Sequence, residues 1–313
     1  MLTRRQLRIK VMQAIFAFQR QQPDDLKELE KFLNGSMAQT FTLFLYMVQL
    51  LVELHKMADG KVTIASKKLL GSEAQKNLTR IFVENKALVK LANSTELQEA
   101  LSKRKIAPWH LDLKYIEKIY EAMIVSKEYV MYTSAAETTF KQDVQFLTFL
   151  YTDIIAPSEE ILDFLEDITI TWTDDYPLVN TSVLLFLKKL KPTKEVVLPV
   201  LIKDQEDVQF AMDLFRKSIL FQDELLGRID GKTPNWEKDR IAQLDLVLII
   251  MAQVEFLYFP SIPVKVTLNE YLEVAKDYSS PKSSVFINGI VDNLLKEFQA
   301  EGKLNKIGRG LME

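Results

Sequence analysis

The sequence has no cysteine among its 313 residues, so it contains neither disulfide bonds nor thiolate metal sites. This composition fits a reducing cytoplasm. It has only 9 glycines, and none form the glycine-rich patterns that bring backbone N–H groups to a phosphate. The two histidines, His55 and His110, have no partner at metal-ligand spacing. These absences predict a protein without metal or cofactor, and they do not suggest an enzyme.

A long apolar run free of charge is also missing. The most apolar stretch, residues 241–259, contains Asp245 and Glu255. A carboxylate inside a bilayer would cost roughly 2.5–3.5 kcal/mol, so a buried amphipathic helix is the better interpretation. The charged N-terminus is not followed by the apolar segment and small-residue cleavage site of a signal peptide. We therefore expect a soluble, cytoplasmic protein that does not bind membranes.

Helical periodicity dominates the chain, and only 10 prolines interrupt it. Thr267 followed by Glu270 predicts a capping box at one helix start. Residues 61–64 and 168–172 have strand-like composition, but nothing pairs with them convincingly. The pattern predicts an all-α protein, with helices near 4–20, 37–58, 73–92, 112–132, 135–155, 158–168, 178–190, 206–229, 238–258, 267–277 and 281–299.

A possible internal repeat appears at an offset of 64 residues. "DVQF" occurs at 143–146 and again at 207–210, and Trp172 and Trp236 are separated by the same offset. Chance similarity between two amphipathic helical segments is the alternative to a duplicated helical unit.

The first helix concentrates positive charge in a mildly acidic protein, which has 40 Lys and Arg against 43 Asp and Glu. No acidic residue precedes Asp24. On a helical wheel, one third of the circumference forms an apolar stripe of Leu7, Val11, Ala14, Ile15 and Phe18. Arg5, Arg8 and Phe16 share an adjoining stripe with Met12 and Gln19.

Cations beside an aromatic ring suit single-stranded nucleic acid. Arginines neutralise phosphates, and a ring offers a base a stacking face worth about 1–3 kcal/mol. In the alternative interpretation, Phe16 packs against a second helical layer and the arginines are ordinary solvated charge. The first helix alone does not decide between the two.

The C-terminal stretch, residues 235–295, closely resembles the transcription antitermination factor NusB. The match runs through Trp236-Glu237, Asp239-Arg240, Ile262-Pro263, Asn269-Glu270, Ala275-Lys276 and "FINGIVD" at 286–292. The first helix, with its arginines and "MQAIFAFQ" at 12–19, is similar to that of the family, and 214–226 resembles the helix before the central motif. The resemblance covers about 1–20 and 207–299.

Residues 21–206 are not covered, because typical family members are much shorter. The resemblance therefore implies a long form of the NusB family with a large insertion after the first helix. It implies two helical subdomains of NusB type, enlarged by the inserted helical region. The expected divisions are 1–22 (basic helix of the core), 23–140 (insertion), 141–203 (unit possibly repeating 207–254), 204–302 (C-terminal domain) and 303–313 (basic tail).

The resemblance also implies a function. Family members bind RNA without catalysis and pair with a small-subunit ribosomal protein, also called NusE. Together they hold the boxA element of nascent RNA in the RNA polymerase antitermination complex, notably during ribosomal RNA transcription.

Site residues follow by transfer from the family. Those expected to contact RNA are Arg4, Arg5, Arg8, Phe16, Tyr278 and Phe286. Asp245 matches an acidic position that faces the protein partner. Lys282 departs from the pattern, because some relatives have an acidic residue there.

The last predicted helix supports part of this expectation independently. Phe286 lies about a quarter turn from the centre of its apolar stripe. Gly289 costs roughly 1 kcal/mol in mid-helix, which suggests a close helix or backbone approach that needs its small size. The alternatives are that Phe286 is peripheral core and that Gly289 serves simple helix packing.

Two other functions compete with antitermination. RNA cytosine methyltransferases have a NusB-like domain before their catalytic domain, but here the NusB-like pattern ends at residue 299 of 313 and leaves no room for one. A helical protein-interaction scaffold without RNA binding is the second. The arginine cluster argues against the scaffold, and the large insertion leaves it open.

Overall fold

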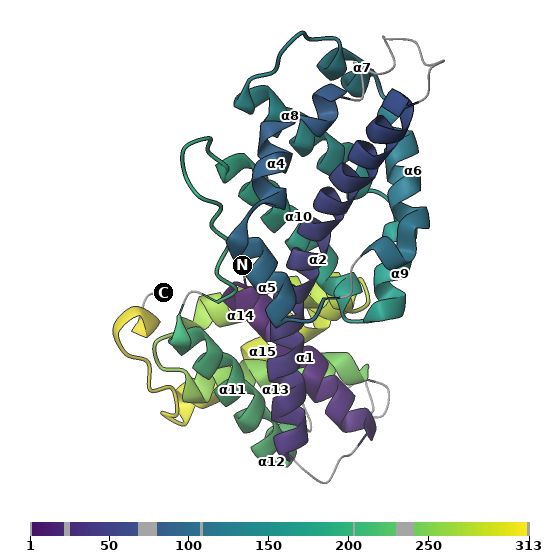
Figure 1. Cartoon of the computed structure of the whole chain (residues 1–313). Coiled ribbons are helices and arrows are strands. Elements are labelled where there is room, and N and C mark those ends of the chain that lie inside the picture. The colour runs from purple at the N-terminus through teal and green to yellow at the C-terminus, as the bar shows by residue number, and fades with distance from the viewer. Residues whose placement is uncertain are drawn as a thin grey trace. The chain divides into compact units, whose positions relative to one another are not determined.

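The computed structural model describes residues 2–21, 26–67, 80–106, 109–202, 204–229 and 241–311, and within them it shows helices and no strand (Figure 1). The prediction of an all-α protein is confirmed. Trp236, Glu237, Asp239 and Arg240, which contribute to the NusB resemblance, lie outside the described residues.

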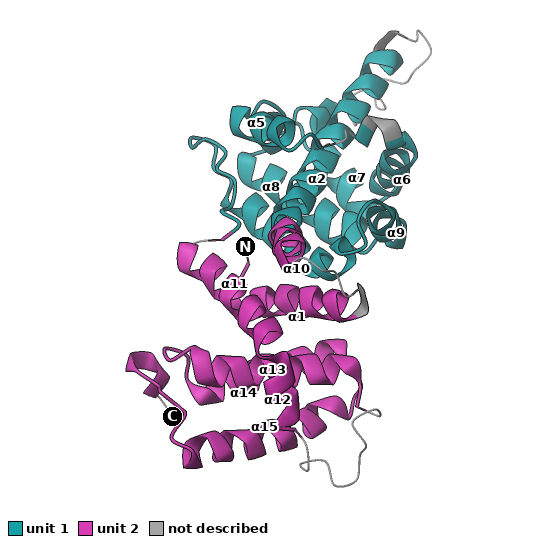
Figure 2. Ribbon diagram, turned by 90° about the horizontal axis from the view of Figure 1, so that it is seen from below, with its two compact units in different colours: residues 1, 38–201 teal, residues 2–37, 202–313 magenta. Residues whose placement is uncertain are grey.

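The chain forms two compact units, drawn in different colours in Figure 2. Unit 1 contains residues 38–201, and unit 2 joins residues 2–37 to residues 202–313. The long helix α2 (Leu26–Lys67) belongs to both, because the division falls after Met37. Unit 2 therefore brings the first helix of the sequence together with the C-terminal helices. The domain limits expected from the sequence stay predictions.

Unit 1 is built around the second part of α2. The stretch from Leu43 to Leu54 is apolar on nearly every side and is almost entirely buried, as expected for a helix surrounded by others. The surrounding helices are α4 (Lys86–Ala92), α5 (Thr95–Lys103), η1 (Trp109–Asp112), α6 (Leu113–Ile124), α7 (Lys127–Thr133), α8 (Phe140–Phe149), the π-helix η2 (Leu150–Ile155), α9 (Glu159–Ile168) and α10 (Trp172–Lys189).

Aromatic side chains fill the core of unit 1. The ring of Tyr46 lies 4.5 Å from that of Trp109 and 5.8 Å from that of Trp172. The Trp109 indole N–H donates to the Tyr46 carbonyl at 2.9 Å, so its polar group is satisfied inside the core. Residues 26–65 of α2 are long and apolar enough to cross a membrane by length and composition, but 78% of the apolar window is buried inside the protein.

Unit 2 is built around α13 (Gln243–Tyr258), whose residues from Val247 to Phe256 are all buried. Helices α1, α11, α12, α14 and α15 pack against it. Their bounds are α1 (Arg4–Gln21), α11 (Gln205–Leu220), α12 (Gln222–Gly227), α14 (Val264–Tyr278) and α15 (Ser283–Ala300), and a short 3-10 helix, η4 (Gly308–Leu311), follows.

The apolar stripe predicted for α1 forms its buried face. Leu7, Val11, Ala14 and Ile15 are fully buried, and Phe18 is partly buried. Arg8 and Met12, which the wheel placed on the adjoining stripe, are buried as well. The buried face of α1 is therefore wider than the sequence pattern indicated.

The predicted capping box is wrong. Helix α14 begins three residues earlier, after Pro263, so Thr267 lies within the helix and is fully buried. Its hydroxyl donates to Glu255, and Glu270 binds arginines of α1. The pair fits the capping pattern, but tertiary contacts occupy both side chains.

The two stretches with strand-like composition are not strands. Residues 61–64 continue α2, and residues 168–172 connect α9 to α10.

His55 has a structural role, since its Nε2 lies 2.8 Å from the Val83 carbonyl oxygen. The proposed repeat pairs α8, η2, α9 and α10 of unit 1 with α11, α12 and α13 of unit 2. Trp236, one half of its tryptophan pair, lies outside the described residues, and the duplication stays a prediction.

Candidate nucleic-acid interface

The arginines at the start of α1 each meet a carboxylate from another helix of unit 2. Arg4 Nε lies 2.9 Å from Asp207 of α11. Arg5 binds Glu270 of α14 with two hydrogen bonds of 2.9 and 3.0 Å. Arg8 binds Glu255 of α13 in the same two-pronged manner, at 2.7 and 2.9 Å. The basic segment is therefore held in place by acidic side chains from three separate helices.

Arg8 is the centre of a buried polar network. Its side chain is 3% exposed and that of Glu255 is 0% exposed. Glu255 also accepts hydrogen bonds from the Thr267 hydroxyl at 2.7 Å and the Tyr271 hydroxyl at 3.2 Å. Such a carboxylate is stable inside a core only because its charge and lone pairs are all engaged.

The network fixes the charge of Arg8. Burial by itself would lower the pKa of the guanidinium, but the hydrogen bonds and the negative charge of Glu255 outweigh it and raise that pKa above its ordinary value. Burial raises the pKa of the Tyr271 hydroxyl well above its usual range, and the charge of Glu255 adds to the effect. Arg8 is therefore a permanent cation whose guanidinium is enclosed by protein.

Arg4 and Arg5 differ from Arg8 in exposure. Their side chains remain 42% and 39% exposed beside their partners. The hydrogen bonds that Arg5 donates to Glu270 raise the pKa of the Arg5 guanidinium. Arg4 also lies over the ring of Phe210, 5.1 Å from its centroid. Each side chain is therefore held by a carboxylate and remains partly exposed to solvent.

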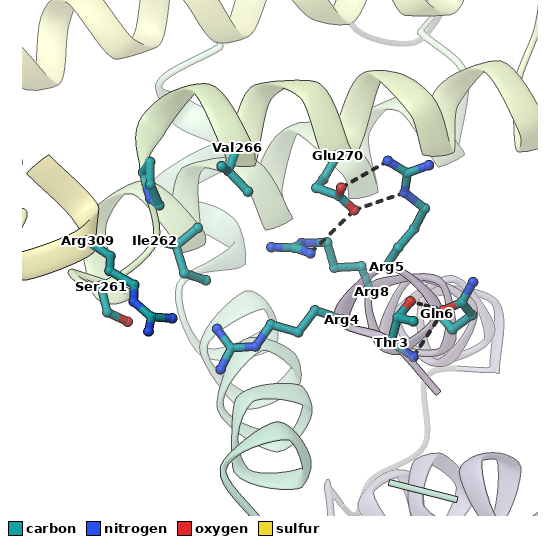
Figure 3. Close-up of a pocket in the computed structure, with 11 residues that line it drawn as sticks. Thr3, Arg4, Arg5, Gln6, Arg8, Ser261, Ile262, Val266, Glu270 and Arg309 are labelled. Atoms are coloured by element: carbon teal, nitrogen blue, oxygen red, sulfur yellow. Dashed lines mark hydrogen bonds and ion pairs between the residues drawn. The ribbon is translucent and has the colours of Figure 1, made fainter. Parts of the chain in front are cut away.

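These side chains border an open groove of about 610 Å³ (Figure 3). Arg4 and Arg5 enter from α1, and Arg309 enters from the opposite side, next to Ser261 (Figure 3). The groove is lined by Thr3, Arg4, Arg5, Gln6, Arg8, Ser261, Ile262, Pro263, Val266, Glu270 and Arg309. Four arginines line the groove, and Asp207, Glu255 and Glu270 pair with three of them, so the local formal charge is +1 and the groove attracts anions.

The predicted aromatic residues do not line this groove. Phe16 is on α1, Tyr278 is the last residue of α14, and Phe286 lies in the first turn of α15. All three are partly buried. The structure therefore brings Arg4, Arg5 and Arg8 together, but it places the three rings elsewhere on unit 2.

Asp245 connects the two helices that carry Tyr278 and Phe286. It is 5% exposed and accepts hydrogen bonds from the hydroxyls of Ser279 and Ser283, the latter at 2.8 Å. Its carboxylate thus stabilises the α14–α15 connection. This is the intramolecular pairing that competes with a direct partner contact, and partner binding at Asp245 stays a prediction.

Two further expectations concern α15. Lys282 is exposed and lies immediately before the helix. Gly289 is exposed too, and a Cβ built on it would meet no atom of the described residues within 4 Å. In the part of the chain that the structure describes, no close approach requires this glycine, contrary to the expectation.

The sequence interpretation missed the carboxylates and Arg309. Glu255 had a usable signal, since a carboxylate within the most apolar stretch of the chain requires a buried cation or donors. Asp207 and Arg309 had none, because their proximity to α1 depends on the tertiary arrangement of unit 2.

Comparison with known proteins identifies the family. Residues 186–296 match the sequence profile of the NusB family. The chain is 41% identical over 110 residues to the transcription antitermination protein NusB of Salinibacter ruber. The aligned region covers 35% of this chain and 69% of that protein. The chain belongs to the NusB family.

Other NusB proteins agree. The chain is 35% identical to the NusB protein of Chloroherpeton thalassium over 123 residues. The aligned region covers 39% of this chain and 58% of that protein. The chain is 37% identical to the NusB protein of Koribacter versatilis over 100 residues, or 32% of this chain and 68% of the relative. No solved structure matches the chain.

The NusB profile covers one side of the groove. The matched residues 186–296 include Glu255, Glu270 and Asp207, whereas Arg4, Arg5, Arg8 and Arg309 lie outside them. The ion pairs therefore attach α1 to the NusB-family helices of unit 2. The 313-residue length fits a long form of the family.

Proposed function

We propose that this NusB-family protein is a non-enzymatic, cytoplasmic transcription antitermination factor that binds single-stranded RNA of the boxA type. It would act with the small-subunit ribosomal protein NusE in the RNA polymerase antitermination complex. The relatives reported above are named transcription antitermination proteins. The observation that carries the RNA-binding proposal is the groove in which Arg4, Arg5 and Arg309 gather on a protein of net charge −3.

The groove offers phosphate contacts of a suitable kind. Arg4 and Arg5 are anchored by Asp207 and Glu270 but remain more than one third exposed. The carboxylates use only some of the guanidinium N–H groups, and a side chain held in this way can donate its other N–H groups to a phosphate with little loss of side-chain entropy. Arg8 is not counted among the phosphate contacts, because its side chain is only 3% exposed.

Base contacts would come from the aromatic residues. Single strands are typically read by stacking and base-edge contacts, while phosphate contacts fix the register. Phe16, Tyr278 and Phe286 are partly exposed on helices of unit 2 and are proposed to supply the stacking faces. Asp245 would fix the positions of Tyr278 and Phe286 through Ser279 and Ser283.

The decisive experiment compares RNA binding by the intact protein and by a groove variant. Fluorescence anisotropy with a labelled boxA-type single strand is expected to show binding that weakens with salt. Arg4→Gln with Arg5→Gln should weaken it strongly. Lys296→Gln is the matched control, because Lys296 is exposed and pairs with Asp292 on α15, away from the groove.

A helical interaction scaffold is the second candidate. The ion pairs favour it, since Arg4, Arg5 and Arg8 already have carboxylate partners without RNA. If the folded groove variant bound RNA like the wild type, the basic groove would not be the site. Retention of NusE together with no binding of any single-stranded RNA by the wild-type protein would support the scaffold.

A further inference from the structure

The tail after α15 folds back onto the connection between α13 and α14. The Ile307 backbone N–H donates to the Pro260 carbonyl at 3.0 Å. The Lys306 ammonium donates to the carbonyls of Glu255 and Phe259, at 3.2 and 3.0 Å, where α13 ends. A cation at a helix C-terminus satisfies free carbonyls and complements the helix dipole. The tail is therefore docked by specific contacts.

Gly310 shows how close this docking is. It is buried, and a Cβ built on it would collide with the Pro260 carbonyl oxygen. Because the obstacle is backbone, any larger residue would require the tail to move. Gly308, two residues earlier, has φ +52°, a conformation that favours glycine. The two glycines flank Arg309 and fix the path of the backbone that carries it.

The docked tail places Arg309 at the groove. Arg4, Arg5 and Arg8 each have a carboxylate partner there. Among the residues that the structure describes, no carboxylate lies within ion-pair distance of Arg309, and its side chain is exposed. An incoming phosphate would share Arg4 and Arg5 with Asp207 and Glu270, but it would meet Arg309 without such competition.

We propose that Arg309 is a phosphate-binding residue of the RNA site, presented by a C-terminal tail that Gly310 and Lys306 lock against the α13–α14 connection. This inference rests on the proposed RNA-binding function and adds to it a contribution from outside the NusB-matched residues 186–296. The basic groove is then complete only when the tail is docked.

The first test is Arg309→Gln in the full-length protein, with a labelled boxA-type single-stranded RNA as the probe. At low salt the variant is expected to bind about tenfold more weakly, as one charged hydrogen-bonding contact is lost. The slope of log affinity against log salt should become shallower by about 0.7. Arg309→Lys should recover part of the affinity. Lys303→Gln removes one charge from the same tail, and this control should bind like the wild type because Lys303 does not line the groove.

The second test moves the tail without changing its charge. Gly310→Ala should reproduce the loss seen for Arg309→Gln, and the double variant should lose no more than either alone. Gly289→Ala is the matched control, because a Cβ there meets no atom within 4 Å among the residues with a described placement. Circular dichroism and the unfolding midpoint establish that each variant is folded.

The outcomes separate the two proposals. If the wild-type protein did not bind the RNA, both the proposed function and this inference would fail. If the wild type bound it and Arg309→Gln matched it in affinity and salt slope, only the inference would be overturned. Strictly additive losses for Gly310→Ala and Arg309→Gln would contradict the role given to the docked tail.

Discussion

At the scale of single residues, Arg4, Arg5 and Arg8 are equivalent in sequence but not in structure. Arg5 and Arg8 lie nearly one helical turn apart, and both use a two-pronged contact with a glutamate. Arg5 keeps 39% of its side chain exposed, whereas Arg8 keeps 3%. The wheel placed the two arginines on one stripe, but it could not show that a carboxylate of α13 lies opposite only one of them.

We predict that Arg8→Met lowers the free energy of unfolding by about 3–5 kcal/mol, because it leaves the Glu255 carboxylate buried without its cation. Urea denaturation followed by circular dichroism would measure the loss. Arg5→Met is the matched control, and about 0–1 kcal/mol is expected for its exposed pair. Adding Glu255→Gln to Arg8→Met should recover part of the stability. Equal losses for the two single variants would contradict the buried network.

Lys306 gives a prediction about pH. Burial lowers its pKa from 10.5 to about 8, partly opposed by the charge of Glu255. Because the folded pKa lies below the unfolded one, the unfolded chain binds more protons between these values, and stability from this group rises with pH across that window. A titration of the Lys306 side chain by NMR should give a midpoint near pH 8. Lys306→Met should remove this rise in stability, and a midpoint above 10 would show that the tail is not docked.

At the scale of elements, the sequence predicts which segments are helical better than it predicts the residues at which each helix begins and ends. Helix α1 and helix α9 (Glu159–Ile168) match their predicted ranges closely. The continuous helix predicted over 112–132 is instead α6 and α7, with Ser126 capping the second through its hydroxyl. The apolar periodicity of the sequence continues across this break, so it does not reveal where the first helix ends. The break is seen only in the structure, where Ser126 caps the second helix.

Tertiary contacts account for the other shifted limits. Helix α10 was expected to begin after Pro177 but begins at Trp172. The Trp172 indole donates to the Gln39 carbonyl, and the Thr40 hydroxyl donates to Asp175. These contacts hold the turn that the proline would otherwise discourage. In the same way, Arg309 could not be predicted from the sequence, because the groove needs α1, α14 and the tail together.

The α14–α15 connection supplies a prediction at this scale. Ser283→Ala removes one of the two hydroxyl donors to the buried Asp245 carboxylate, and a loss of about 1–3 kcal/mol in the free energy of unfolding is expected. Ser284→Ala, at the neighbouring position, should change stability little. RNA affinity should fall in the Ser283 variant as well, because the same connection positions Tyr278 and Phe286. Unchanged stability would show that Asp245 is satisfied in another way.

At the scale of the whole molecule, the overall charge of −3 does not favour RNA, so attraction must be local. The proposed RNA contacts are of two kinds. Arginine–phosphate contacts weaken as salt rises, whereas stacking on aromatic rings depends little on salt. Phe16→Ala should weaken RNA binding by about 1–3 kcal/mol with little change in salt dependence, because stacking releases few counterions. Anisotropy titrations at several salt concentrations would separate the two kinds. Circular dichroism is needed first, since Phe16 is partly buried and could contribute to packing.

The number of phosphate contacts sets the final prediction. Arg4, Arg5 and Arg309 are the groove arginines with exposed side chains, and each contact to a single strand contributes about 0.7 to the slope of log affinity against log salt. The wild-type slope should therefore be about −2, and Arg4→Gln with Arg5→Gln should reduce its magnitude to about 0.7. Lys296→Gln should leave it unchanged. A much steeper wild-type slope would mean that RNA follows a longer basic path than this groove, and a slope near zero would mean that the arginines serve the fold alone.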